Sequence, residues 1–99
     1  MKHVRLDIER LAVDGIDRPL AYGDVLVVEQ DGHDGLQWEL VVMFLGKVAF
    51  DEWSGSLDVL TLEGRRLAGE AFLVRAREQM HVFRGTSQLD GLLVDELGA

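Results

Sequence analysis

Apolar side chains recur at every second position through much of this chain, and that spacing is the strongest constraint on its fold. From Val4 to Ile8 they alternate with charged residues, and Leu11 and Val13 continue the alternation in the opposite phase. Such alternation is typical of a β-strand that has one face on a core and the other in water. The change of phase at residues 9–10 predicts a β-bulge there.

Turn residues divide the rest of the chain into further short strands. Residues 14–19 contain the only proline, residues 31–35 contain two Asp-Gly pairs, and residues 51–56 form another polar stretch. Six or seven strands separated in this way predict an all-β fold, a mostly antiparallel small barrel or sandwich. Ninety-nine residues suffice for one domain, so we expect a single β-barrel-like domain over residues 1–99.

The most apolar segment is Leu36 to Phe50, with the sequence LVVMFL at its centre. A helix is one interpretation, but the valines and the flanking turns favour a strand. A strand that is apolar on both sides needs a cover on both faces. Its outer face is expected either beneath a C-terminal helix or in a dimer interface.

The C-terminal residues follow a different spacing. Leu89, Leu92, Leu93 and Leu97 recur at helical intervals, and Ser87 is a suitable N-cap. This pattern predicts one short C-terminal helix.

Composition excludes several classes of chemistry. The chain has no cysteine, which removes disulfides, thiolate zinc sites and a cysteine nucleophile. There is no signal-peptide pattern, and the longest apolar run, Leu40 to Leu45, is much shorter than the roughly 20 residues of a membrane-spanning helix. We therefore expect a cytoplasmic protein that does not bind membranes.

The net charge of −8 argues against nucleic-acid binding, because that affinity depends on neutralising phosphates. The charge is unevenly distributed, however. Between Gly64 and Gly85 there are five arginines and two glutamates, a balance of +3, whereas the remaining residues carry −11. Positive charge is thus concentrated on one predicted hairpin, FLVRAREQMHVFRG.

The turn of this hairpin decides whether its basic residues share a face. A two-residue turn at Glu78–Gln79 would mix the arginines with apolar side chains, so the hydrophobic pattern favours a three-residue turn over Glu78 to Met80. That register pairs Arg77 with His81 and Arg75 with Phe83. One face would then carry Arg75, Arg77, His81 and Phe83, and the core face would carry Phe72, Val74, Ala76 and Val82, with Arg84 at a rim.

Two arginines, a histidine and an aromatic ring on one face would bind a carboxylate or phosphate. The expected ligand-binding residues are therefore Arg75, Arg77, His81 and Arg84. Two other interpretations remain open: a solvated face that has no ligand, and a basic face that meets the acidic face of a second copy.

Motifs for catalysis or metal binding are lacking. His3, His33 and His81 lie far apart, and no HExxH, GxSxG, Walker or dinucleotide motif is present. We expect no catalytic residues, no metal and no cofactor.

These patterns together favour a non-enzymatic role. The sequence predicts a small acidic module that self-associates, as a dimer, and binds an anionic small molecule or a protein partner. The alternative is a small barrel-type enzyme or ligand-binding protein, with His, Asp and Glu groups around an interior cavity.

Overall fold

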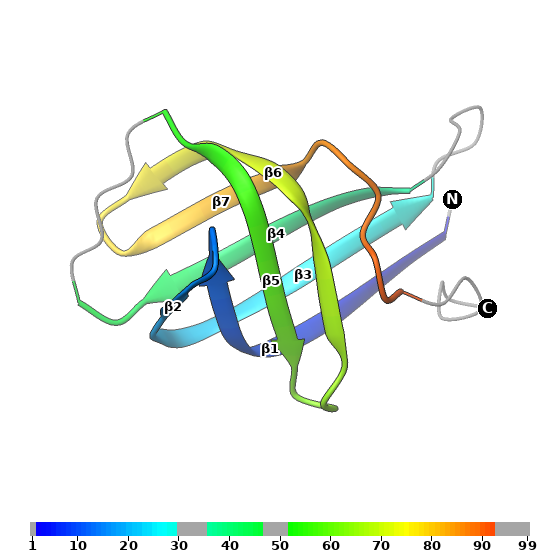
Figure 1. The fold of residues 1–99 in the computed structure, drawn as a ribbon, viewed down its shortest axis with the longest axis horizontal. Helices are drawn as coiled ribbons and strands as arrows, with labels where there is room; N and C mark the ends of the chain where they lie inside the picture. Colours follow the sequence, from blue (N-terminus) through cyan, green and yellow to red (C-terminus); the bar gives the residue numbers. More distant parts are fainter. Residues whose placement is uncertain (1, 30–35, 47–51, 93–99) are drawn as a thin grey trace.

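The computed structural model describes residues 2–29, 36–46 and 52–92, with the backbone alone for Lys2 (Figure 1). The predicted loop at 31–35 lies outside these ranges. The described residues form seven strands: β1 (Lys2–Val13), β2 (Ile16–Arg18), β3 (Leu20–Glu29), β4 (Gln37–Phe44), β5 (Ser54–Thr61), β6 (Arg66–Arg77) and β7 (Met80–Gly85). The all-β prediction is confirmed.

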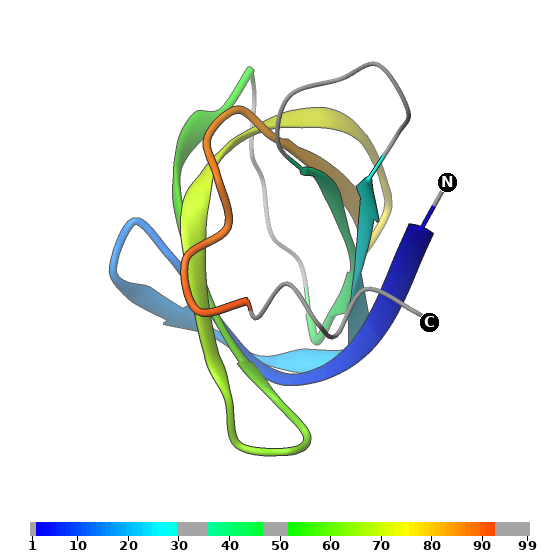
Figure 2. The same ribbon diagram turned by 90° about the vertical axis from the view of Figure 1, so that its right-hand side faces the viewer.

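The strands form a closed antiparallel barrel. Their order is β2-β1-β3-β4-β7-β6-β5, and a further pairing of β1 with β5 closes the ring. Six strands therefore make the barrel, with β2 as an extra strand beside β1, and Figure 2 shows the ring end-on. In this ring β5 stands across the barrel from β4.

The first strand closes the barrel by changing partners. Its N-terminal half pairs with β3, from Lys2↔Glu29 to Asp7↔Asp24, and its C-terminal half pairs with β5. The register shifts between Ile8 and Arg10, so the predicted bulge is present. A bulge strengthens local bend and twist, and this one lets β1 cross from one side of the barrel to the other.

Alternate residues of the strands fill the barrel. In β4, Trp38, Leu40, Val42 and Phe44 are buried, whereas the residues between them are less so. The same alternation on the other strands completes one apolar core, which includes Leu11, Val13, Val25, Val27, Leu57, Val59, Leu67 and Phe83. The LVVMFL sequence is thus part of a strand as far as Phe44, with the core on one side.

Trp38 fixes the segment that follows β7. Its ring leaves no room for a side chain at Gly85 and little at Gly69, and its Nε1 donates a hydrogen bond to the Ser87 carbonyl oxygen at 2.8 Å. Beyond Ser87, Asp90 forms a β-bridge with Ala68. The described residues from Thr86 to Leu92 contain no helix, and the rest of the predicted C-terminal helix, residues 93–99, lies outside the described part.

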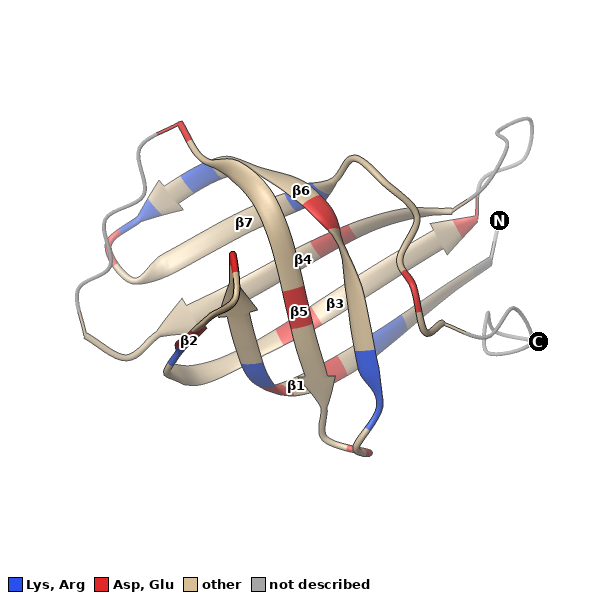
Figure 3. Cartoon of the chain, viewed as in Figure 1, with Lys and Arg blue, Asp and Glu red and all other residues tan. Residues whose placement is uncertain are grey.

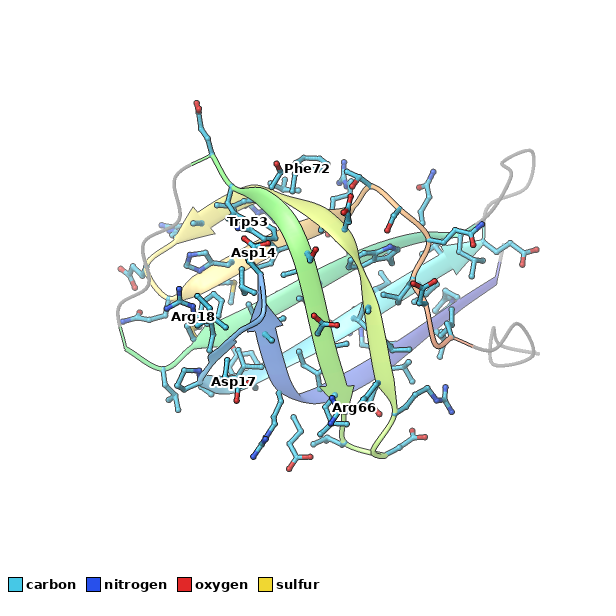
Figure 4. All side chains as sticks on the ribbon, in the orientation of Figure 1. Asp14, Asp17, Arg18, Trp53, Arg66 and Phe72 are labelled. Atoms are coloured by element: carbon cyan, nitrogen blue, oxygen red, sulfur yellow. The ribbon has the colours of Figure 1, made fainter. Side chains whose placement is uncertain are left out.

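The turn between β1 and β2 is attached to β5 by Asp14, which lies beside Trp53 in Figure 4. Its Oδ1 accepts a hydrogen bond from the Ser56 backbone N–H at 2.9 Å, and its Oδ2 accepts one from Trp53 Nε1 at 2.9 Å. These two bonds, the first more than the second, hold the pKa of the Asp14 carboxyl below its ordinary value.

No helix among the described residues is long and apolar enough to cross a membrane.

Candidate functional site

The hairpin of β6 and β7 has a tighter turn than we predicted. Arg77 pairs with Met80 and Ala76 with His81, so the turn consists of the two residues Glu78 and Gln79. Glu78 adopts a positive φ of 57°, which makes so short a connection possible. The prediction of a three-residue turn, with Arg77 opposite His81, is wrong.

A second bulge changes the phase of β6. Leu73 pairs with Phe83 and Arg75 with Val82, which leaves Val74 as an extra residue. The register shift therefore lies between Leu73 and Arg75. Leu73 consequently packs against the core, whereas Val74 is exposed.

Several residues of the hairpin therefore lie on the opposite face from the one that we predicted. His81 and Phe83 are buried, at 1% and 0% exposure, although we placed both on the outer face. The His81 ring meets Phe44 edge-on at 4.8 Å, and its Nδ1 lies 3.2 Å from the Gln79 carbonyl oxygen. The exposed face that joins His81 to the arginines does not form.

The arginines do share the outer surface, together with residues of β3 and β4. Register places them in three rows across β3, β4, β7 and β6. The valine row is Asp24, Val41, Val82 and Arg75; the methionine row is Tyr22, Met43, Met80 and Arg77; and the ion-pair row is Leu26, Glu39, Arg84 and Phe72.

The middle of the valine and methionine rows is apolar. We call Tyr22, Val41, Met43, Met80 and Val82 the outer strip. Tyr22 is 56% exposed and Met80 37%, whereas Val82 is almost covered and belongs to no part of the core cluster. The strip is thus an apolar surface that faces away from the barrel interior.

The two ends of the valine row carry opposite charges. Asp24 stands on β3 and Arg75 on β6, and Figure 3 shows acidic colour on β3 and basic colour at the end of β6. Asp24 makes one loose ion pair, at 3.9 Å to Arg5. In the ion-pair row Arg84 Nη2 lies 3.2 Å from Glu39 Oε2.

Arg75 and Arg77 are both exposed, and neither makes an ion pair with the described residues. Three of the four predicted ligand-binding residues therefore lie on one surface. Sequence reasoning missed Tyr22, Asp24 and Glu39, because only the strand register brings them beside the hairpin.

A polar groove of about 390 Å³ lies on the other side of the barrel, over β1, β5 and the start of β6. Its charged residues are Arg10, Asp17, Asp58, Arg66 and Asp90, of which Figure 4 labels Asp17 and Arg66. The groove is lined by both carboxylates and guanidinium groups, which favours no single ligand charge. No group of metal-binding side chains occurs among the described residues.

Comparison with known proteins found no matching family model, no similar curated protein and no similar solved structure.

Proposed function

We propose that this protein is a non-enzymatic assembly module that self-associates through the outer strip. The observation that carries the proposal is the strip itself, an apolar surface on a chain whose net charge is −8. Tyr22 and Met80 are exposed and Val41 and Met43 are half-buried, and apolar side chains grouped on the outside of a charged protein are typical of a surface that contacts another protein.

The residue types of the strip and its borders support this proposal. Tyrosine, methionine and arginine are enriched in protein interfaces, where large side chains supply most of the binding energy. Tyr22, Met80 and Arg77 stand in the same row. Burial of their apolar surface would contribute roughly 25 cal/mol per Å² before the costs of association.

The arginines give the partner a preferred charge. Because Arg75 and Arg77 make no ion pair with the described residues, both guanidinium groups are available to carboxylates of a partner. The same observation favours a second candidate function, the binding of a small anion between these two arginines. Apolar side chains pack the barrel interior. This packing does not support the alternative of an enzyme or ligand-binding protein with an interior cavity.

Substitution of Met80 by aspartate tests the proposal. A carboxylate in the middle of the strip would be desolvated in the interface, so Met80→Asp is expected to be a monomer at about 50 μM, where the parent chain is expected to be a dimer. Sedimentation equilibrium measures both masses, and circular dichroism checks that the variant folds.

Leu62→Asp is the matched control. Leu62 is also an exposed apolar residue, at 64%, but it lies in the β5–β6 turn, away from the strip. This variant should dimerise like the parent chain. A monomeric parent chain, or a Met80→Asp variant that still dimerises, would refute self-association through the strip.

A further inference from the structure

Within the rows of the outer surface, acidic residues lie toward β3 and arginines lie toward β6. In the valine row the acid stands on β3 and the arginine on β6, with two valines between them. In the methionine row an aromatic ring stands at the β3 end and Arg77 at the β6 end. A surface with opposite charges at its two ends can be complementary to itself when it is reversed.

We infer that the partner of the outer strip is a second copy of this chain, stacked face to face about a two-fold axis that runs parallel to β4 and β7 and between them. The inference rests on the proposed function. Such an axis places β3 of one copy over β6 of the other, and β4 over β7.

The valine row then becomes complementary to its copy. Asp24 of one chain faces Arg75 of the other at both ends of the row, and Val41 faces Val82 in the middle. Sheets stacked face to face lie about 10 Å apart, a distance that two opposed layers of side chains fill. The outer face of a barrel is convex, so the gap widens toward β3 and β6, where the long arginine side chains stand.

The other two rows agree with the same axis. In the methionine row Tyr22 faces Arg77, a pairing that favours a cation–π contact, and Met43 faces Met80. In the ion-pair row Glu39 faces Arg84, and Leu26 faces Phe72. Each of the six facing pairs therefore joins opposite charges, a cation and a ring, or two apolar groups.

The competing two-fold axis gives the opposite result. An axis across the strands would place β6 over β6 and β3 over β3. Arg75 and Arg77 would then lie against the arginines of the second copy, and like charges at an interface oppose association. Charge thus selects the axis parallel to the strands.

The dimensions of the molecule set an upper limit on the size of this interface. A typical stable interface buries about 800 Å² on each partner, which is a patch roughly 28 Å square. The molecule measures 38 × 27 × 21 Å. In Figure 1 the strands β3, β4 and β7 lie at the back, so their outer surface faces away from the viewer.

Exchange of the two end charges tests this arrangement. Asp24→Arg places arginines at both ends of the row, and Arg75→Asp places aspartates at both ends. Each variant alone is expected to raise the dimer Kd at least tenfold, on the order expected for two repulsive pairs. An equimolar mixture should form heterodimers with a Kd within about threefold of the parent value, because both end pairs are then opposite in charge. Native mass spectrometry separates the species by mass.

Asp58→Arg and Arg66→Asp, on the polar groove across the barrel, are matched controls that should dimerise alone like the parent chain. Exchange of Glu39 and Arg84, as Glu39→Arg and Arg84→Glu, is an independent second test with the same expected pattern. The melting temperature of each variant shows whether it folds.

These outcomes distinguish the two-fold arrangement from self-association through the strip. A mixture that stays monomeric, or single reversals that dimerise normally, would overturn the two-fold arrangement. If Met80→Asp abolishes dimerisation in that case, the proposed function still stands. A parent chain that is monomeric would overturn both.

Discussion

At the scale of the residue, Asp14 shows how one carboxylate can connect two parts of a barrel. It accepts one bond from the backbone of β5 and one from the Trp53 indole, and Trp53 in turn packs edge-on against Phe83 at 5.3 Å. The β1–β2 turn is thereby joined to a ring that lies on the core. The residue also has a φ of 51°, a conformation that aspartate and asparagine tolerate better than most residues.

Asp14→Asn should lower the melting temperature by several degrees at neutral pH. Asparagine keeps the shape and tolerates the turn, but its amide group replaces one of the two acceptors, so one donor loses its bond. Thermal denaturation followed by circular dichroism measures the difference. Asp17→Asn, an exposed aspartate of β2, is the control and should melt with the parent chain.

The same difference should depend on pH. Because the folded pKa of Asp14 lies below the unfolded value of about 3.9, the stabilisation is complete above that value and is lost as the pH falls through the folded pKa. The gap in melting temperature between parent and Asp14→Asn should therefore be widest near pH 6 and narrow toward about pH 2. A gap that widens in acid would contradict this role for Asp14.

At the scale of the element, the two bulges differ in how visible they are in the sequence. The bulge in β1 could be predicted because apolar and charged residues alternate strictly before it, and Leu11 and Val13 continue the apolar spacing in the opposite phase after it. The bulge in β6 lies within Phe72-Leu73-Val74, where three consecutive apolar residues satisfy either phase. The hydrophobic pattern therefore cannot locate this bulge, and the inward orientation of His81 and Phe83 was missed with it.

The turn after β6 was missed for a related reason. Two-residue hairpin turns are usually marked by glycine, asparagine or aspartate, whose backbones accept a positive φ. Here Glu78 and Gln79 occupy the turn, and Glu78 takes the positive φ despite its side chain. Nothing in the sequence distinguishes these two residues from an ordinary loop.

Glu78→Gly is expected to stabilise the protein. A residue with a side chain costs roughly 1–2 kcal/mol in the left-handed region, and relief of that cost exceeds the extra chain entropy of glycine, for a net gain of about 0.5 kcal/mol. Gln79→Gly is the matched control: Gln79 keeps a negative φ, so only the entropic loss applies and stability should fall. Urea denaturation measures both changes, and a destabilised Glu78→Gly variant would contradict the assignment.

At the scale of the whole molecule, the fold class could be predicted but the functional surface could not. Short alternating strands and turn residues are enough to indicate a small antiparallel barrel. The rows on the outer surface, by contrast, combine residues from Tyr22 to Arg84, and they meet only because β3 lies beside β4 and β4 beside β7. The sequence located the arginines, whereas the acids and apolar groups beside them depend on register.

The dimer should weaken as ionic strength rises. Its proposed charge pairs lie at the rim, where salt screens them over a Debye length of about 8 Å at 0.15 M, whereas the apolar centre is unaffected. Between about 0.02 and 0.5 M NaCl we expect the Kd to rise, but by less than about tenfold. Sedimentation equilibrium across this range measures the change. The Leu62→Asp control should give the same slope, and a dimer that tightens with salt would argue against the charge pairs.

The pairing of β1 with β5 also sets the order in which a growing chain can fold. Residues from Ile8 to Val13 can pair with β5 only after Leu57 to Thr61 have been synthesised. In the same way, the edge of β4 that faces β7 stays unpaired until β7 has been synthesised. Contacts so distant along the chain slow folding, because the intervening loop must be ordered before they form. Until synthesis reaches β7, the nascent chain exposes unpaired strand edges, and the barrel can close only afterwards.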